Sequence, residues 1–172
     1  QYNNVYSFSK FDFDKNECSK MIVMHSITYR TALLKNNGYV QDTGISFTDM
    51  EYDMIPMLYI NSFIFANFKL YQYFLGREGQ TVSLDVSSKS IEAYLKIYDT
   101  LNRVYLGIKN TNEAVRYSNA RIVFYNLLSS LYFVALCFSH KTHELNCKLH
   151  EIRSFVKTND DLLYKKLRRL HA

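Results

Sequence analysis

Two carboxylates stand close together in the stretch GISFTDMEY, which covers residues 44–52: Asp49 and Glu51. A carboxylate held in a fixed position can remove a proton from a hydroxyl group, so either side chain is a candidate general base. Residues i and i+2 do not share a helix face, so they are not a ready-made acid–base pair. Acids in the first turn also stabilise a helix N-terminus. A capping role and a role as base are compatible.

Two other patterns contain residue types that bind metal ions. Asp12 and Asp14 form a DxD pattern in FDFD, but the stretch is polar and aromatic and does not end a buried apolar strand. Four further residues share one stripe of a predicted helix: His140, His143, Cys147 and His150. The stripe is about 15 Å long, so one metal could reach only two or three of its members. We therefore predict no metal site here and interpret the stripe as a partly polar helix–helix seam.

The composition favours a globular chain with long helices. Of the 172 residues, 48% are hydrophobic and 22% are charged, which is unlike a disordered or low-complexity chain. Glycine (5) and proline (1) are scarce, so few tight turns are expected. The three cysteines have no CxxC spacing, which is typical of reduced thiols in the cytosol. From His140 onward the sequence contains eight Lys or Arg residues and four Asp or Glu residues, and such a basic tail favours phosphate-bearing partners.

The first 85 residues have a mixed α/β texture. Short strands are predicted within residues 1–14, in MIVMHSITY (21–29), and as a pair within 62–75. A short helix over 30–38 is closed by Gly38, and a second begins at Thr48 or Asp49, either of which can cap it. Pro56 is expected to kink or end that second helix. Residues 76–83 form a predicted loop.

The remaining residues predict helices, one from about Ser88 and three over 114–138, 142–157 and 160–171. Ile122–Phe138 has 17 residues without a charge, and we interpret it as the buried central helix of this half. A membrane span is the alternative, although polar residues interrupt the run. The helix at 162–170 carries leucines on one side and four basic residues elsewhere, so its leucine face either packs inward or meets an anionic membrane.

Three segments, taken in order, resemble the second half of the catalytic domain of family 2 glycosyltransferases, of the bacterial type that builds capsular or cell-surface polysaccharide: MHSITYRTALLKNNG (24–38), GISFTDMEY (44–52) and KLYQYFLGREGQTVS (69–83). The resemblance covers about residues 20–85. It implies an α+β, mainly helical fold, in which 1–85 is the C-terminal half of a nucleotide-diphospho-sugar transferase domain with short strands and 86–172 is a helical, bundle-like region. The family's nucleotide-binding half would precede Gln1, so we expect a fragment that is inactive alone.

The resemblance also implies roles for individual residues. Asp49 corresponds to the family's catalytic base, although Thr48 stands where many members have Glu. Arg77 and Ser83 correspond to residues near the donor diphosphate, and Glu51 and His25 are further substrate-binding candidates. A divalent metal, Mg or Mn, is expected in the full-length enzyme, with ligands mostly outside this chain.

The predicted function is therefore part of an inverting glycosyltransferase. It would move a sugar from a nucleotide-diphospho-sugar donor to a saccharide or lipid-linked acceptor, in the cytoplasm or at the inner face of the membrane. Further expected partners are a peripheral membrane surface at 162–170 and a second copy of the chain, but no nucleic acid. The alternative is a helical interaction or membrane-docking module without catalysis.

Overall fold

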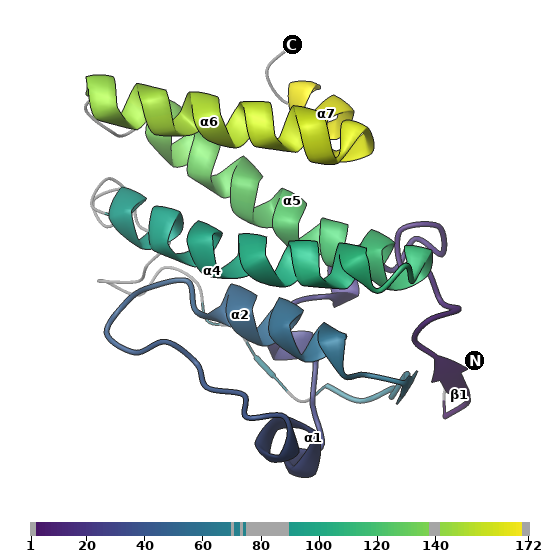
Figure 1. Cartoon of the computed structure of the whole chain (residues 1–172). Helices are drawn as coiled ribbons and strands as arrows, with labels where there is room; N and C mark the ends of the chain where they lie inside the picture. The colour runs from purple at the N-terminus through teal and green to yellow at the C-terminus, as the bar shows by residue number, and fades with distance from the viewer. Residues whose placement is uncertain (1–2, 70, 73, 75–89, 138–141, 170–172) are drawn as a thin grey trace.

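The structure, a computed structural model, describes residues 3–69, 71–72, 74, 90–137 and 142–169. Within these ranges helices dominate, and the strands form one two-stranded sheet, so the predicted α+β, mainly helical class is confirmed. Figure 1 shows α6 and α7 at the top, α5 and α4 below them, and α2 and α1 at the bottom. The predicted boundary at residue 85 falls outside the described residues. Helices from both sides of it share one hydrophobic core.

Four helices form the C-terminal part: α4 (Ile91–Asn110), α5 (Ala114–Cys137), α6 (His143–Asn159) and α7 (Asp161–Arg168). Their positions confirm the predicted helices. The apolar residues of α4 recur with helical spacing and face α5, where Tyr105 and Tyr98 stack on Phe124 with ring centroids 4.4 Å and 5.8 Å away. Such aromatic pairs add to the free energy gained by burying their surface. The α4–α5 pair is therefore the centre of the fold.

The helix α5 contributes more buried residues than any other described element, as its uncharged sequence predicts. Its buried side chains lie on several faces, because α4 packs on one side and α7 on another. By length and composition α5 could also cross a membrane, yet half of its most apolar stretch is buried inside the protein. That placement is the one expected of a core helix.

The helices α6 and α7 meet at Asp160. Its carboxylate accepts a hydrogen bond from the Leu163 N–H at 2.9 Å and so caps α7. The side chains of Leu163 and Leu167 are buried, so the leucine face of α7 packs inward rather than toward solvent. Leu170 lies outside the described residues.

The N-terminal part contains α1 (Thr31–Asn36) and α2 (Asp49–Met54), joined to short 3-10 turns η1 (Ser19–Met21), η2 (Met24–Ser26) and η3 (Ile55–Leu58). Gly38 follows α1 with a φ of 63°, which supports the predicted helix end. Pro56 lies at the start of η3, so α2 ends there as expected.

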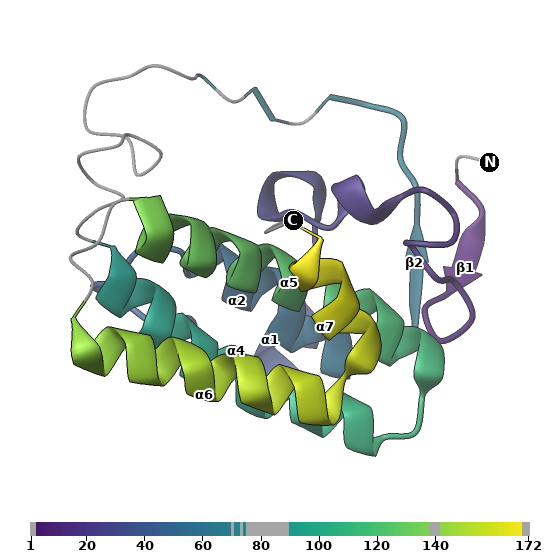
Figure 2. The same cartoon turned by 90° about the horizontal axis from the view of Figure 1, so that it is seen from above.

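Strands are fewer than the sequence predicts. β1 (Val5–Ser7) pairs antiparallel with β2 (Ser62–Ile64), with Tyr6 opposite Phe63, and Figure 2 shows the two side by side at one end of the molecule. The strand predicted over 21–29 is wrong, because that run forms η1 and η2 instead. Within 62–75, the described residues after Ile64 form no strand.

Two buried polar side chains of α5 hold the N-terminal segment in place. The amide of Asn119 accepts from the Phe13 N–H and donates to the Phe11 carbonyl oxygen, both at 2.9 Å. Arg116 donates to the Met57 carbonyl oxygen and pairs with Glu113 at 3.0 Å. These bonds satisfy backbone groups that would otherwise be buried without partners, and they fix η3 and hence α2 against α5.

Candidate functional site

Asp49 is the first residue of α2, and the chain turns sharply just before it. Phe47 has a φ of 68°, a left-handed conformation that is strained for an aromatic residue. The ring of Phe47 stacks on Tyr94 of α4, with centroids 4.0 Å apart, and this packing holds the strained turn. Asp49 is thereby kept at a fixed position at the edge of the helical core.

The surroundings of Asp49 favour its protonated form. Burial raises the pKa of this carboxyl above its ordinary value, while the backbone N–H groups of Met50 and Asp49 and the nearby His25 act in the opposite direction. A carboxylate with a raised pKa is a better proton acceptor than an exposed one. A raised pKa of this carboxyl is compatible with a role as general base.

The predicted side-chain cap of α2 is not formed. Thr48 occupies the N-cap position, but its side chain makes no capping hydrogen bond. Its hydroxyl oxygen instead accepts from the Gln41 side-chain amide at 2.9 Å, and so does its carbonyl oxygen at 3.0 Å. Thr48 therefore binds the preceding loop, and Asp49 is the side chain that interacts with the backbone N–H groups of the first turn of α2.

Asp53 is the residue of this site that sequence reasoning missed. It lies one turn after Asp49 on α2 and is 6% exposed, and its Oδ1 has no hydrogen-bond partner among the described residues. Burial, with a smaller contribution from Asp49, raises the pKa of Asp53 from 3.8 to about 7. The i, i+4 spacing of the two aspartates was visible in the sequence and could have shown that they share a helix face.

Three tyrosines surround Asp53. The ring of Tyr52 contacts Tyr29 and Tyr39, with centroid distances of 4.9 Å and 6.3 Å. Burial, followed by the charge of Asp53, raises the pKa of the Tyr29 hydroxyl, so this hydroxyl stays protonated at neutral pH. The hydroxyl of Tyr39 is also buried without a partner in the described part of the chain. The described part of the chain thus leaves two buried oxygens near α2, one of Asp53 and one of Tyr39, without a hydrogen-bond partner.

Replacing Asp53 tests this burial. Because its pKa is higher in the folded than in the unfolded chain, its stabilising contribution is present at low pH and is lost as the pH rises from about 4 to about 7. Between about pH 5 and pH 8 the wild type should lose about 3 kcal/mol of unfolding free energy through this group, and Asp53→Asn should not. Urea unfolding at both pH values measures the difference. Asp42→Asn, at an exposed position, is the control. An equal change of unfolding free energy with pH in all three proteins would contradict the prediction.

The other predicted site residues are only partly brought together. His25 of η2 lies close enough to Asp49 to affect its pKa, and its ring stacks on Tyr71 with centroids 5.7 Å apart. Glu51 is 1% exposed and points away, since its Oε2 accepts from the Asp42 N–H at 3.0 Å. Its described contact is thus structural. Arg77 and Ser83 lie outside the described residues.

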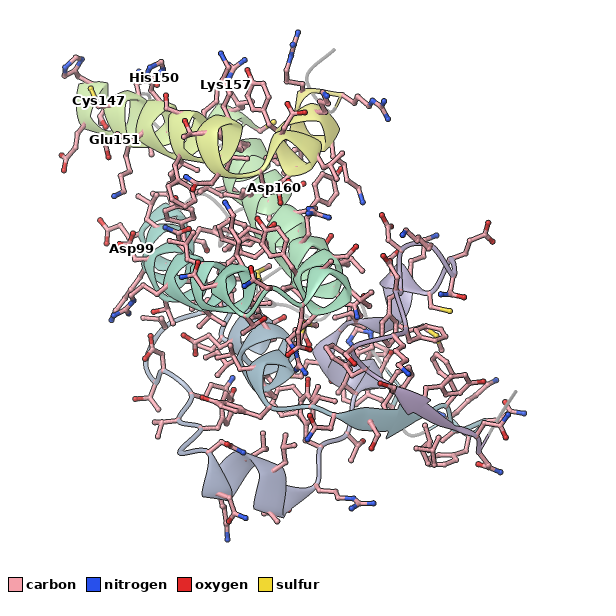
Figure 3. All side chains as sticks on the ribbon, turned by 45° about the vertical axis from the view of Figure 1, so that its right-hand side comes forward. Asp99, Cys147, His150, Glu151, Lys157 and Asp160 are labelled. Atoms are coloured by element: carbon pink, nitrogen blue, oxygen red, sulfur yellow. The ribbon has the colours of Figure 1, made fainter. Side chains whose placement is uncertain are left out.

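Neither of the two sequence patterns that resemble metal sites forms one among the described residues. Asp12 is buried and accepts from the N–H groups of Asp14 and Lys15, both at 3.1 Å, as in an Asx turn. The predicted seam of His and Cys residues on α6 is wrong: His143, Cys147 and His150 are exposed, and Figure 3 shows the last two on the outer side of α6. Among the described residues no group of three His, Cys, Asp or Glu could hold a metal ion.

Comparison of the chain with protein-family models gives no match. Comparisons with curated proteins and with solved structures give no significant match either. A functional assignment therefore depends on the residues themselves and on their geometry.

Proposed function

We propose that the chain is part of an inverting glycosyltransferase, with Asp49 as its general base. The observation that carries this proposal is the position of Asp49 at the start of α2, half-buried, held by the Phe47–Tyr94 stack and with a raised pKa. The order of the three segments that resemble family 2 glycosyltransferases supports it. The donor is a nucleotide-diphospho-sugar, and the acceptor is a saccharide or a lipid-linked saccharide.

The proposed reaction is a single displacement. The Asp49 carboxylate takes the proton of an acceptor hydroxyl while the oxygen of that hydroxyl attacks the anomeric carbon of the donor sugar. The bond from the anomeric carbon to the diphosphate oxygen breaks, and the nucleoside diphosphate leaves with the bonding electrons. Its negative charge needs a cation or N–H donors, and Arg77 is the candidate in this chain. One carboxylate suffices, because no covalent intermediate forms.

The surface beside the site supports a larger assembly. Apolar side chains at the end of β2 and in the segment after it are exposed, including Ile64 at 54% and Phe68 at 65%. Exposed apolar side chains that gather on one segment are typical of a surface that contacts other protein. In this proposal the partner is a nucleotide-binding half of the same enzyme, which also supplies most ligands of a Mg or Mn ion.

A transfer assay tests the proposal directly. The full-length enzyme would be incubated with a panel of nucleotide-diphospho-sugars and candidate acceptors, and product would be analysed by NMR. We expect transfer with inversion at the anomeric carbon. Retention of configuration, or a full-length chain whose sequence before Gln1 lacks a βαβ pattern ending in DxD, would contradict the proposal.

Arg77→Ala is expected to weaken donor binding more than it affects folding. A charge-assisted contact to a phosphate contributes about 1.5–3 kcal/mol, so affinity for the nucleoside diphosphate should fall about 10- to 100-fold. Calorimetry on the intact enzyme measures the affinity, and thermal unfolding measures the stability. The neighbouring Lys69→Ala is a control for charge alone. Unchanged affinity in the Arg77 variant would remove this residue from the donor site.

A further inference from the structure

A groove runs between α5, α6 and α7, on the side of the protein away from α1 and α2. Its volume is about 490 Å³, which lies in the range of small-molecule sites. Its floor is apolar, formed by Leu136, Leu149, Val156 and Leu167, and Leu136 is 51% exposed. Two arginines, Arg153 and Arg168, and two tyrosines, Tyr132 and Tyr164, complete the lining.

No acid among the described residues forms an ion pair with the two arginines of the groove. None of the ion pairs between described residues includes Arg153 or Arg168. The guanidinium of Arg153 lies 6.0 Å from the ring centroid of Tyr164, and its hydrogen bond to the hydroxyl lowers the pKa of Tyr164. Contact with Tyr164 restricts Arg153 at the groove mouth, where a planar guanidinium can bind two phosphate oxygens.

A second hollow on the other side of α7 is a useful comparison. It has a volume of about 360 Å³ and is also rich in Lys and Arg. Three of its cations already have carboxylate partners: Arg121 with Asp160 at 2.7 Å, Lys165 with Asp161 at 2.6 Å and Lys166 with Asp14 at 3.6 Å. Asp14 itself lines the hollow. An anion would therefore meet less net positive charge there than in the groove.

We infer that the groove binds an anionic membrane phospholipid, with the phosphate at Arg153 and Arg168 and the adjoining glycerol and acyl carbons on the apolar floor. Leu163 and Leu167 of α7 pack inward and only Leu162 of its leucines is strongly exposed, and the apolar lining at Leu136 and Leu149 supplies further surface for acyl carbons. The phosphates of a nucleic acid would pair with the arginines equally well but would leave the apolar floor unfilled. This site is separate from Asp49 and does not depend on transferase activity.

Vesicle flotation with the full chain tests the inference. We expect binding to phosphatidylcholine vesicles that contain phosphatidylglycerol and little binding to phosphatidylcholine alone. Each basic residue near an anionic surface contributes about 1 kcal/mol, so Arg153→Ala with Arg168→Ala should lower the partition coefficient about 30-fold. Leu136→Ser should lower it several-fold. The matched control removes two distant charges, Lys20→Ala with Lys35→Ala, and should change it little.

Three results would overturn the inference. Equal loss in the control pair would mean that only net charge matters. Full competition by millimolar inorganic phosphate, with no effect of Leu136→Ser, would show a site for a free anion rather than a lipid. Binding of a single-stranded RNA that depends on both arginines, with vesicle binding unchanged in the double variant, would assign the groove to nucleic acid. Circular dichroism of each variant checks that it is folded.

Discussion

Asp49→Asn should reduce sugar transfer by the full-length enzyme about 10²- to 10⁴-fold, which is the usual contribution of a general base. The amide has nearly the same shape as the carboxylate but cannot accept the proton of the acceptor hydroxyl. Donor binding should stay near the wild-type value, because the base acts on the acceptor. Initial rates at saturating donor, together with calorimetric titration of the donor, measure the two effects separately.

The stability of the same variant distinguishes a base from a structural cap. Burial raises the pKa of Asp49, so its ionised form is less stable in the folded than in the unfolded chain. Asp49→Asn removes that cost and should leave the melting temperature at neutral pH unchanged or higher. If the negative charge of Asp49 stabilised the N-terminus of α2 by more than its burial costs, the same change would instead lower the melting temperature.

A control variant and a pH profile complete the test of Asp49. Asp99→Asn removes a carboxylate that is 62% exposed on α4 and should keep full activity. In the wild type, the transfer rate should fall as the pH drops through the raised pKa of Asp49. The residual activity of the variant should not show this fall. Near wild-type turnover in Asp49→Asn would remove this residue from the mechanism.

The helical half of the fold could be predicted because its signals are local. Apolar residues recur with helical spacing in α4, and the uncharged run in α5 is too long to be left in water. Pro56 marks a helix end because its ring restricts the backbone, and Gly38 does so because it readily adopts a positive φ. These features depend on neighbours within a few residues, and so the sequence contains them in full.

The errors concern properties that depend on distant parts of the chain. Residues 21–29 have strand-like composition, yet none of the described strands lies beside them, and the backbone forms 3-10 turns instead. The stripe of His143, Cys147 and His150 has helical spacing, but which face of α6 meets α5 is decided by tertiary packing. Asp53 is notable because it is buried near Tyr29 and Tyr39, and that arrangement brings together three separate segments.

Asp160→Ala should have the largest effect on stability. The buried carboxylate of Asp160 accepts from the Tyr105 hydroxyl at 2.5 Å and from the Arg121 guanidinium at 2.7 Å, and it also caps α7. Its removal leaves Arg121, whose side chain is 19% exposed, and Tyr105 without their partner. Breaking such a buried pair costs about 3–5 kcal/mol. Thermal unfolding should show a fall of about 10 °C for a chain of this size.

The neighbouring residue provides a matched control for Asp160. Asp161 pairs with Lys165 at 2.6 Å, but both side chains are 65% exposed, so Asp161→Ala should cost less than about 1 kcal/mol. Equal losses in the two variants would show that the Asp160 contacts add nothing beyond surface charge. Asp160→Asn, which keeps a capping oxygen, is expected to lie between them and to remain folded if the alanine variant does not.

The pH dependence of the Asp160 variants separates its charge from its shape. Burial alone would raise the pKa of this carboxyl, but the hydrogen bonds from Tyr105, Leu163 and Arg121 outweigh it and lower the pKa below 3.8. A carboxyl whose pKa is lowered by folding stabilises the fold at pH values above its ordinary pKa. This contribution disappears as the pH falls through the folded-state pKa. The difference in unfolding free energy between the wild type and Asp160→Asn should therefore become smaller in acid. A difference that does not change with pH would mean that Asp160 joins α4, α5 and α7 by hydrogen-bond geometry alone, without its negative charge.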